Sequence, residues 1–218
     1  MLFLRPAVHP ILYSFRRCPY AIRARYTLCL LNIQVEIREV VLRNKPEALL
    51  RLGGRSSVPQ LISADGERYP ESMDIVRWAL AQSQGVLAYS AFEEKQIAAW
   101  LFQTDHRFKF WLDKYKYADR HPDFSEAYYR AQGERFLRRL ERTLSQQAYL
   151  LGDKMSIADV LVFPFIRQFR GVDSPWFDQS NYTYVKAWLT QILEDEVFAK
   201  VMVKLPAWQE GDEVRFFP

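Results

Sequence analysis

The clearest structural signal in the chain lies in residues 9–30, which read HPILYSFRRCPYAIRARYTLCL. The first seven residues are short, apolar and aromatic, which predicts a β-strand over residues 9–15. Pro19 suits the first position of a helix, because its missing N–H has no partner to lose there. Beyond it, apolar residues recur at helical spacing, at Ile22, Tyr26, Cys29 and Leu30. We therefore expect a strand, a junction at Cys18, and a helix.

The alternation of strands and helices continues to about residue 83. The pattern predicts, in order, a strand at 35–40, a short helix at 46–52, strands at 58–62 and 67–69, and a helix from Ser72. Asp65-Gly66 is a strong hairpin signal between two of these strands. Ser72 is predicted to be the N-cap of the last helix. The order βαβαββα, with a crossover followed by an antiparallel hairpin, is thioredoxin-like.

From Phe92 onward no strand signal remains. A long stripe at three-and-four spacing predicts a helix, with Ile97, Trp100, Leu101, Thr104, Phe108, Trp111 and Tyr115 on one face. Residues 125–146 predict a second helix, the capping box Ser156-Ile157-Ala158-Asp159 opens a third, and helices continue through 182–203. The fold class is thus α/β plus all-α. We divide the chain into a thioredoxin-like domain at 1–83, a linker at 84–91 and an all-helical domain at 92–218.

Composition and charge exclude several classes of protein. Hydrophobic residues make up 49% of the 218 residues and charged residues 26%, which is typical of a globular chain rather than a disordered one. The formal charge of +4 is well short of a dedicated nucleic-acid binder. The arginines between residues 135 and 142 alternate with Glu134 and Glu141, so we expect a solvated face. No apolar run approaches the ~20 residues that span a membrane, and no signal peptide is evident.

The positions of the cysteines and histidines allow predictions about the cellular compartment and about metal binding. Cys18 and Cys29 are eleven residues apart, or roughly 16 Å along one helix, which is too far for a disulfide. Two reduced thiols favour a cytoplasmic protein. The three histidines, His9, His106 and His121, lack the spacing of metal ligands, so we expect no metal.

Cys18 is the predicted nucleophile. Unpaired backbone N–H groups and the helix dipole favour an anion at a helix N-terminus. Arg16, Arg17 and Arg23 are near in sequence, and no neighbour is acidic. Both effects lower the pKa of a thiol, to roughly 3.5–7.5 in comparable sites, so we expect a reactive thiolate. Cys29 lies on the apolar stripe of the same helix, and we expect it in the core.

Two further signals accompany the cysteine. Val58-Pro59 stands at the start of a strand and is a candidate cis peptide bond. In a thioredoxin-like fold this turn faces the helix that carries the cysteine, where its backbone can pair with an extended peptide. Ser72 at a helix start suits a carboxylate, and Glu71 beside it suits an ammonium group. The alternative is a plain N-cap next to an acid that the helix dipole favours.

Together these residues resemble the glutathione transferase superfamily over essentially the whole chain, and within it the cysteine-type omega class. The matching strings are Cys18-Pro19-Tyr20, Asn44-Lys45-Pro46-Glu47, Val58-Pro59 and Glu71-Ser72. The resemblance implies glutathione as co-substrate. It also implies that Cys18 forms a mixed disulfide with glutathione, while Tyr20 lines the site.

The resemblance assigns the remaining residues to the parts of glutathione. Val58 would pair its backbone with the cysteinyl part, and Pro59 would shape the turn. Glu71 and Ser72 would bind the γ-glutamyl head, and Lys45 would meet the glycyl carboxylate.

The chain also resembles the two-domain bacterial glutaredoxins, through the segments 54–59 and 70–76. Their pattern has a second cysteine three residues after the first, where this chain has Ala21. An internal dithiol–disulfide cycle is therefore unavailable. A monothiol cycle remains, in which Cys18 takes glutathione from a mixed disulfide and a second glutathione resolves it.

We therefore expect a glutathione-dependent thiol transferase or deglutathionylating enzyme that acts on an electrophilic or disulfide acceptor. Two alternatives stay open: a non-catalytic relative that binds a partner protein, and a conjugating transferase that uses the hydroxyl of Tyr13 or Ser14. The superfamily implies a possible homodimer, whereas the two-domain glutaredoxins imply a monomer. The aromatic stripe is mostly core by its spacing, and one or two of its rings are candidates to border an acceptor pocket.

Overall fold

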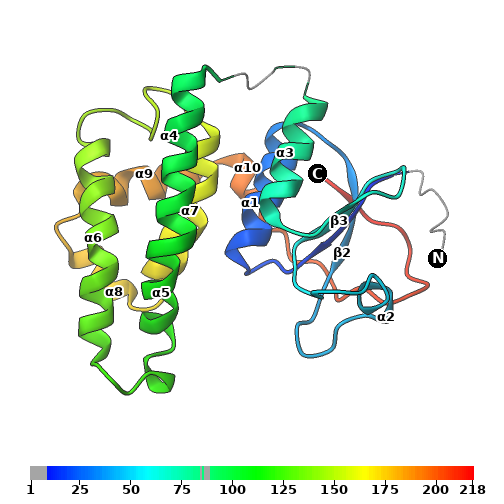
Figure 1. Cartoon of the computed structure of the whole chain (residues 1–218), viewed down its shortest axis with the longest axis horizontal. Helices are drawn as coiled ribbons and strands as arrows, with labels where there is room; N and C mark the ends of the chain where they lie inside the picture. Colours follow the sequence, from blue (N-terminus) through cyan, green and yellow to red (C-terminus); the bar gives the residue numbers. More distant parts are fainter. Residues whose placement is uncertain (1–8, 84, 86–88) are drawn as a thin grey trace. The chain divides into compact units, whose positions relative to one another are not determined.

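The computed structural model describes residues 9–83, 85 and 89–218, and these residues form two compact units (Figure 1). The first unit comprises Met1–Leu87 together with Glu196–Pro218, and the second comprises Ala88–Asp195. Half of the linker expected at 84–91, namely residues 84 and 86–88, lies outside the described residues.

The first unit is built on a five-stranded sheet with the order β4-β3-β1-β2-β5. Its strands are β1 (Ile11–Ser14), β2 (Val35–Glu39), β3 (Gln60–Ile62), β4 (Arg68–Tyr69) and β5 (Phe216–Phe217). Its helices are α1 (Pro19–Leu30), α2 (Glu47–Leu50), α3 (Ser72–Gln82) and α10 (Glu196–Val201). β1 and β2, which α1 connects, pair in parallel, and β3 and β4 pair antiparallel. The thioredoxin-like order βαβαββα and the fold class are confirmed.

Strand β5 is not anticipated by the sequence, and the expectation of no strand after Phe92 is wrong. Phe217 and Phe216 pair antiparallel with Val35 and Glu36 of β2. Two residues carry too little periodicity to predict a strand, so β5 exists because the edge of β2 offers a partner. Residues 196–218, which were predicted to belong to the helical domain, instead pack with the first unit.

Helix α1 contains two arginines that are fully buried, Arg23 and Arg25. Arg25 Nη1 lies 3.6 Å from Glu39 Oε2, and its guanidinium is 5.1 Å from the ring of Phe217. Glu39 also accepts a hydrogen bond from the backbone N–H of Arg16 at 2.7 Å. Burial lowers the pKa of Arg25 to about 10 and raises the pKa of Glu39. Burial away from water is the main cause of both shifts.

The second unit is all-helical in its described part. Its elements are α4 (Ala91–Phe102), a π-helix η1 (Gln103–Phe108), α5 (Lys109–Lys116), a 3₁₀ turn η2 (Ala118–Arg120), α6 (Glu126–Leu144), α7 (Ile157–Arg170), α8 (Ser174–Gln179) and α9 (Thr183–Leu193). The predicted stripe runs through the first three elements and buries Trp100, Thr104, Phe108 and Tyr115. Helix α8 was not predicted, because six residues give less than two full helical turns of pattern.

The predicted capping box at the start of α7 is confirmed. Asp159 is fully buried and accepts hydrogen bonds from the backbone N–H groups of Ser156 and Leu150 and from the indole Nε1–H of Trp188, each at 2.9 Å. One carboxylate therefore fixes the helix start, the preceding loop and α9 together.

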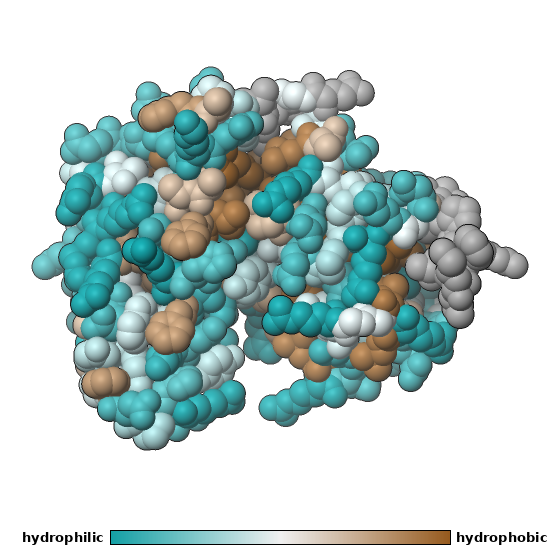
Figure 2. All heavy atoms as spheres, in the orientation of Figure 1, coloured by the Kyte–Doolittle hydropathy of each residue, from teal (hydrophilic) through white to brown (hydrophobic). Residues whose placement is uncertain are grey.

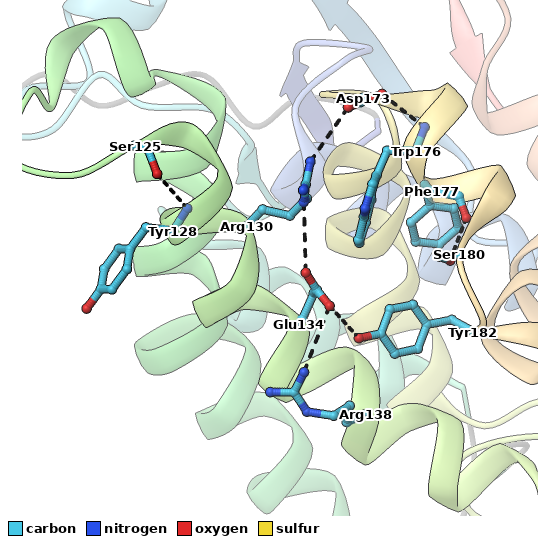
Figure 3. Close-up of polar contacts among 10 residues, drawn as sticks. All are labelled: Ser125, Tyr128, Arg130, Glu134, Arg138, Asp173, Trp176, Phe177, Ser180 and Tyr182. Carbon is cyan, nitrogen blue, oxygen red and sulfur yellow. Dashed lines mark hydrogen bonds and ion pairs between the residues drawn. The ribbon is translucent and has the colours of Figure 1, made fainter.

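A second polar network joins α6 to α8 and α9 (Figure 3). Tyr182 donates to Glu134 at 2.8 Å, and Arg130 and Arg138 each form an ion pair with Glu134 at 3.9 Å. Arg130 also approaches Asp173, the N-cap of α8, at 3.8 Å. On this face of α6 the arginine charges are therefore matched by carboxylates. Of the helices in the described ranges, none is long and apolar enough to cross a membrane.

We expect Arg25→Met to lower the free energy of unfolding by about 3–5 kcal/mol, because it leaves the buried carboxylate of Glu39 without its counter-charge. Adding Glu39→Gln should recover part of this loss. The amide removes the charge but keeps an acceptor for the N–H of Arg16. Urea unfolding of the two single variants and the double variant gives the coupling free energy. A double variant as unstable as the sum of the two single losses would contradict the assignment.

Candidate functional site

Cys18 lies at the N-terminus of α1, as predicted. It is the N-cap residue, with φ −74° and ψ 123°, and Pro19 follows at the start of the helix. Its carbonyl accepts the first helical hydrogen bond from Ile22 at 2.9 Å, and its N–H donates to Phe15 at 3.0 Å. The first turn of α1 contains no acidic residue. The half-buried thiol thus stands beside the unpaired N–H groups of a helix start, where an anion is favoured.

The thiol contacts the turn that precedes β3. Cys18 Sγ is 3.7 Å from the carbonyl oxygen of Val58, and the peptide bond between Val58 and Pro59 is cis. The side-chain amide of Gln60 donates to the carbonyl oxygens of Arg55 and Ser57, at 2.8 and 2.7 Å. The backbone that faces Cys18 is therefore held in one conformation by a buried side chain behind it.

Arg68 of β4 fixes the same turn from the other side. Its guanidinium donates to Gln60 Oε1 at 2.9 and 2.6 Å and to the carbonyl oxygen of Leu52 at 2.6 Å. Neither Gln60 nor Arg68 was predicted from the sequence. The signal of Gln60 was a polar side chain at the start of a short apolar strand, and Arg68 belongs to a two-residue strand with no pattern, so neither position indicates its partner.

The start of α3 differs from the prediction in one respect. Glu71 is the N-cap and Ser72 is the first helical residue, because the carbonyl of Glu71 accepts from the N–H groups of Asp74 and Ile75. Ser72 is 3% exposed, and its Oγ accepts a hydrogen bond from Arg23 Nη1 at 3.4 Å. Since the hydroxyl oxygen is an acceptor in that contact, its own hydrogen can be donated to a ligand.

The other predicted residues contact the same loop or the same helix. Glu71 forms an exposed ion pair with Arg55 at 3.8 Å, and Lys45 Nζ donates to Ser56 Oγ at 3.3 Å. The ring of Tyr20 lies 5.5 Å from the guanidinium of Arg23. Loop 55–59 is thus contacted by Cys18, Lys45 and Glu71. Within the first unit, every predicted site residue belongs to loop 55–59, contacts it, or contacts Arg23 of α1.

The arginines near Cys18 in sequence are directed to different partners. Arg16 donates its backbone N–H to Glu39 and its guanidinium to the carbonyl of Met202 at 3.3 Å. Arg23 is buried beneath Ser72, while Arg17 is exposed with its guanidinium 5.6 Å from the ring of Phe15. The feature of the described structure that favours a negative charge on the Cys18 thiol is therefore the N-terminus of α1.

The two candidate hydroxyl groups are both buried. Tyr13 is 3% exposed, its OH accepts from Arg38 Nη1 at 2.7 Å, and burial raises its pKa. Ser14 is fully buried, and its Oγ has no hydrogen-bond partner among the described residues. The expectation for Cys29 is wrong, because this thiol is only partly buried. In the described part of the chain, no group of three or more His, Cys, Asp or Glu residues is arranged to hold a metal ion.

Comparison with models of known protein families identifies the superfamily to which the chain belongs. It matches the models of the glutathione S-transferase N-terminal domain over residues 12–86 and of the glutathione S-transferase C-terminal domain over residues 111–191. The chain belongs to the glutathione transferase superfamily. The predicted resemblance is therefore confirmed at the level of the family.

Among curated proteins, the chain is similar to glutaredoxin 2 of Escherichia coli strain K12, with 42% identity over 67 residues. The match covers 31% of this chain and 31% of that protein, so it spans about a third of the curated relative. This local similarity supports the predicted likeness to two-domain glutaredoxins.

Solved structures share the whole fold at low identity. A glutathione transferase family member from Pseudomonas fluorescens Pf-5, with two glutathione molecules bound, has a TM-score of 0.79 at 17% identity, covering 90% of this chain and 95% of that one. The tau class glutathione S-transferase from mango, Mangifera indica, has a TM-score of 0.77 at 18% identity, covering 90% and 93%. These similarities establish the fold.

We expect oxidised glutathione to modify Cys18 and not Cys29, although both thiols are partly buried. Cys29 lies in the last turn of α1, where the helix dipole disfavours a thiolate. Mass spectrometry of digested protein should place one glutathione on Cys18. Cys29→Ser should keep the adduct and Cys18→Ser should abolish it. An adduct mapped to Cys29 would refute the site assignment.

Proposed function

We propose that the protein is a glutathione-dependent thiol transferase that uses Cys18 in a monothiol cycle. The observation that carries the proposal is the position of Cys18 Sγ, at the N-terminus of α1 and 3.7 Å from the carbonyl oxygen of Val58. A nucleophilic thiol and a backbone edge for an extended peptide are the two parts that such a reaction needs.

The proposed reaction has two exchange steps. The Cys18 thiolate attacks the glutathione sulfur of a mixed disulfide, so that the bond between Cys18 and glutathione forms while the original S–S bond breaks. The acceptor leaves as a thiolate and takes a proton from water. A second glutathione thiolate then attacks the glutathione sulfur of the adduct, which releases glutathione disulfide and regenerates the Cys18 thiolate.

The residues around loop 55–59 have the chemistry to hold the tripeptide. The backbone of Val58 would pair with the cysteinyl part, and Pro59 would keep the turn in place. The Ser72 hydroxyl and the first N–H groups of α3 suit the γ-glutamyl carboxylate. Glu71 would accept the ammonium group in place of Arg55, its partner at 3.8 Å. Separately, Lys45 would bind the glycyl carboxylate and Tyr20 would line the site.

Three further observations support an enzyme of this kind over the alternatives. The hydroxyl groups of Tyr13 and Ser14 are both buried, which disfavours a hydroxyl-type conjugating transferase. The curated relative with local identity is named a glutaredoxin, and a relative of the same fold from Pseudomonas putida carries one glutathione disulfide per subunit. A non-catalytic partner-binding protein has no need of a thiol at a helix start. The cytoplasmic location and the homodimer stay predictions.

We expect turnover of a glutathione mixed disulfide, formed with 2-mercaptoethanol, to exceed turnover of chlorodinitrobenzene greatly. Conjugation needs the thiolate of free glutathione to be stabilised in the site, and a cysteine thiolate there would repel that anion. Cys18→Ser should abolish disulfide turnover, because a hydroxyl is far less nucleophilic at neutral pH, whereas Cys29→Ser should leave it unchanged. Efficient conjugation together with full disulfide turnover by Cys18→Ser would rule out the cysteine mechanism.

We expect Ser72→Ala and Glu71→Gln each to weaken binding of S-methylglutathione more than tenfold. Each removes a charge-assisted contact of about 1.5–3 kcal/mol. Ser83→Ala is the matched control at the other end of α3, since the Ser83 hydroxyl bonds only its own helix, at the carbonyl of Leu80. Glu67→Gln is the control for the lost charge. Calorimetric titration measures all four, and equal affinities would leave Ser72 and Glu71 as helix-start residues without a binding role.

A further inference from the structure

The turn that leads from β1 into α1 carries two arginines directly before the thiol. The N–H of Cys18 donates to the carbonyl oxygen of Phe15 at 3.0 Å, so Arg16 and Arg17 form the tip of a tight turn. Arg16 is directed back into the unit, where its guanidinium donates to the carbonyl oxygen of Met202 at 3.3 Å. Arg17 is exposed. Since neighbouring Cα atoms are only about 3.8 Å apart, Arg17 adds a solvated positive charge to the surface around the thiol.

The charge of Arg17 is not neutralised by the residues that the structure describes. Its guanidinium lies 5.6 Å from the centroid of the Phe15 ring, a contact that orients the group but leaves its charge in place. None of the described carboxylates forms an ion pair with it, and the first turn of α1 contains no acidic residue. An anion that approaches the thiol therefore meets a free guanidinium group at Arg17.

A second exposed arginine stands on the loop that contacts the thiol. Arg55 is three residues before Val58, whose carbonyl oxygen lies 3.7 Å from Cys18 Sγ. The backbone of Arg55 is fixed by Gln60, but its side chain is 84% exposed and forms an ion pair with Glu71 at 3.8 Å. Figure 2 shows that hydrophilic side chains cover much of the face of the first unit that it draws. The charged end of Arg55 is thus accessible from solvent, on a loop of fixed conformation.

Glutathione bound as proposed above would change the charge balance of this surface. Glu71 would accept the ammonium group of the tripeptide, so it would no longer neutralise Arg55. Lys45 would bind the glycyl carboxylate, and the γ-glutamyl carboxylate would lie at the start of α3. Each charge of the tripeptide then has a partner, whereas Arg17 and Arg55 have none. The surface that faces the rest of the mixed disulfide would therefore carry two uncompensated guanidinium groups.

We propose that the acceptor half of the mixed disulfide is an acidic peptide segment, with carboxylates close to its glutathione-bearing cysteine, and that Arg17 and Arg55 select it. The inference rests on the thiol transfer proposed for Cys18. Guanidinium groups bind carboxylates by paired, charge-assisted hydrogen bonds, and opposite charges also speed the encounter of enzyme and substrate.

The selection acts in the first exchange step only. In that step the bond between Cys18 and the glutathione sulfur forms, the bond between glutathione and the acceptor cysteine breaks, and the acceptor leaves as a thiolate. The carboxylates of the acceptor lie within reach of the two guanidinium groups until it leaves. The second step, in which glutathione resolves the adduct, involves no acceptor and so does not discriminate between acceptors. The preference is therefore expected in kcat/KM for the mixed disulfide.

The test uses three heptapeptides whose central cysteine carries glutathione. A glycine flanks the cysteine on each side, followed by two glutamates, two glutamines or two lysines. Each kcat/KM is divided by the rate of uncatalysed exchange of the same peptide with dithiothreitol, which removes differences in the leaving thiol. We expect about threefold from each guanidinium group, or about tenfold in favour of the glutamate over the glutamine peptide, with the lysine peptide slowest. Added salt should reduce the preference, because the charges are exposed.

Single substitutions assign the preference to its residues. Arg17→Gln and Arg55→Gln should each reduce the ratio of the glutamate to the glutamine peptide about threefold, and the double variant should abolish it. Arg77→Gln is the matched control, because Arg77 is also an exposed arginine of the first unit with one carboxylate partner, Asp74 at 3.5 Å. It should leave the ratio unchanged.

The outcomes separate this proposal from the one on which it rests. A protein that turns over all three peptides at equal normalised rates would overturn the acidic acceptor and leave the thiol transfer intact, whereas turnover of none would refute both. The rate at which iodoacetamide alkylates Cys18, measured against pH, gives the pKa of its thiol. If Arg17→Gln slows the three peptides equally and raises that pKa, Arg17 acts on the thiol and not on the acceptor, which would also overturn the proposal.

Discussion

The buried pair of Arg25 and Glu39 is the interaction on which the first unit depends. Arg25 belongs to the helix that begins at Cys18, Glu39 ends the parallel strand that follows, and Phe217 of the last strand packs against the guanidinium. Glu39 also holds the backbone of Arg16, two residues before the thiol. Desolvation of both groups is unfavourable. The nitrogens of the Arg25 guanidinium have no hydrogen-bond partner among the described residues, so the ion pair with Glu39 and the ring of Phe217 are the contacts that offset this cost. The pair connects the helix that begins at Cys18 to the strand that follows it.

Regular elements were predictable because their periodicity is local. The βαβαββα order, the stripe through Trp100 and Phe108, and the capping box at Asp159 follow from patterns within one segment. The features that the sequence did not predict share a different cause. Strand β5, the half-buried position of Cys29, and the roles of Gln60 and Arg68 depend on partners far along the chain. No pattern within a segment can indicate such a partner.

The candidate site shows the same division. The sequence predicted Cys18, Val58 and Ser72 as site residues. In the structure Cys18 contacts Val58, and Ser72 contacts Arg23 of the helix that begins after Cys18. The sequence did not indicate that Arg23 is buried under Ser72, since an arginine on a helix is usually solvated. On α6, the alternation of arginine and glutamate predicted a solvated face, and the structure agrees, since Arg135, Arg138, Arg139 and Arg142 are all exposed. The ion pairs of Glu134 are with Arg130 and Arg138. Charge counts along a helix do not reveal which arginines a carboxylate pairs with.

The first unit is discontinuous in sequence, and this affects how the chain is made. Glu196–Pro218 supply α10, β5 and the ring that packs against Arg25, while the second unit is the uninterrupted stretch between the two pieces. A ribosome releases residues in order, and domains generally fold as units once their residues are available. The helical unit can therefore complete its core during synthesis. The unit that carries the thiol has to wait for the final twenty or so residues, with the edge of β2 open and Arg25 exposed to water until then.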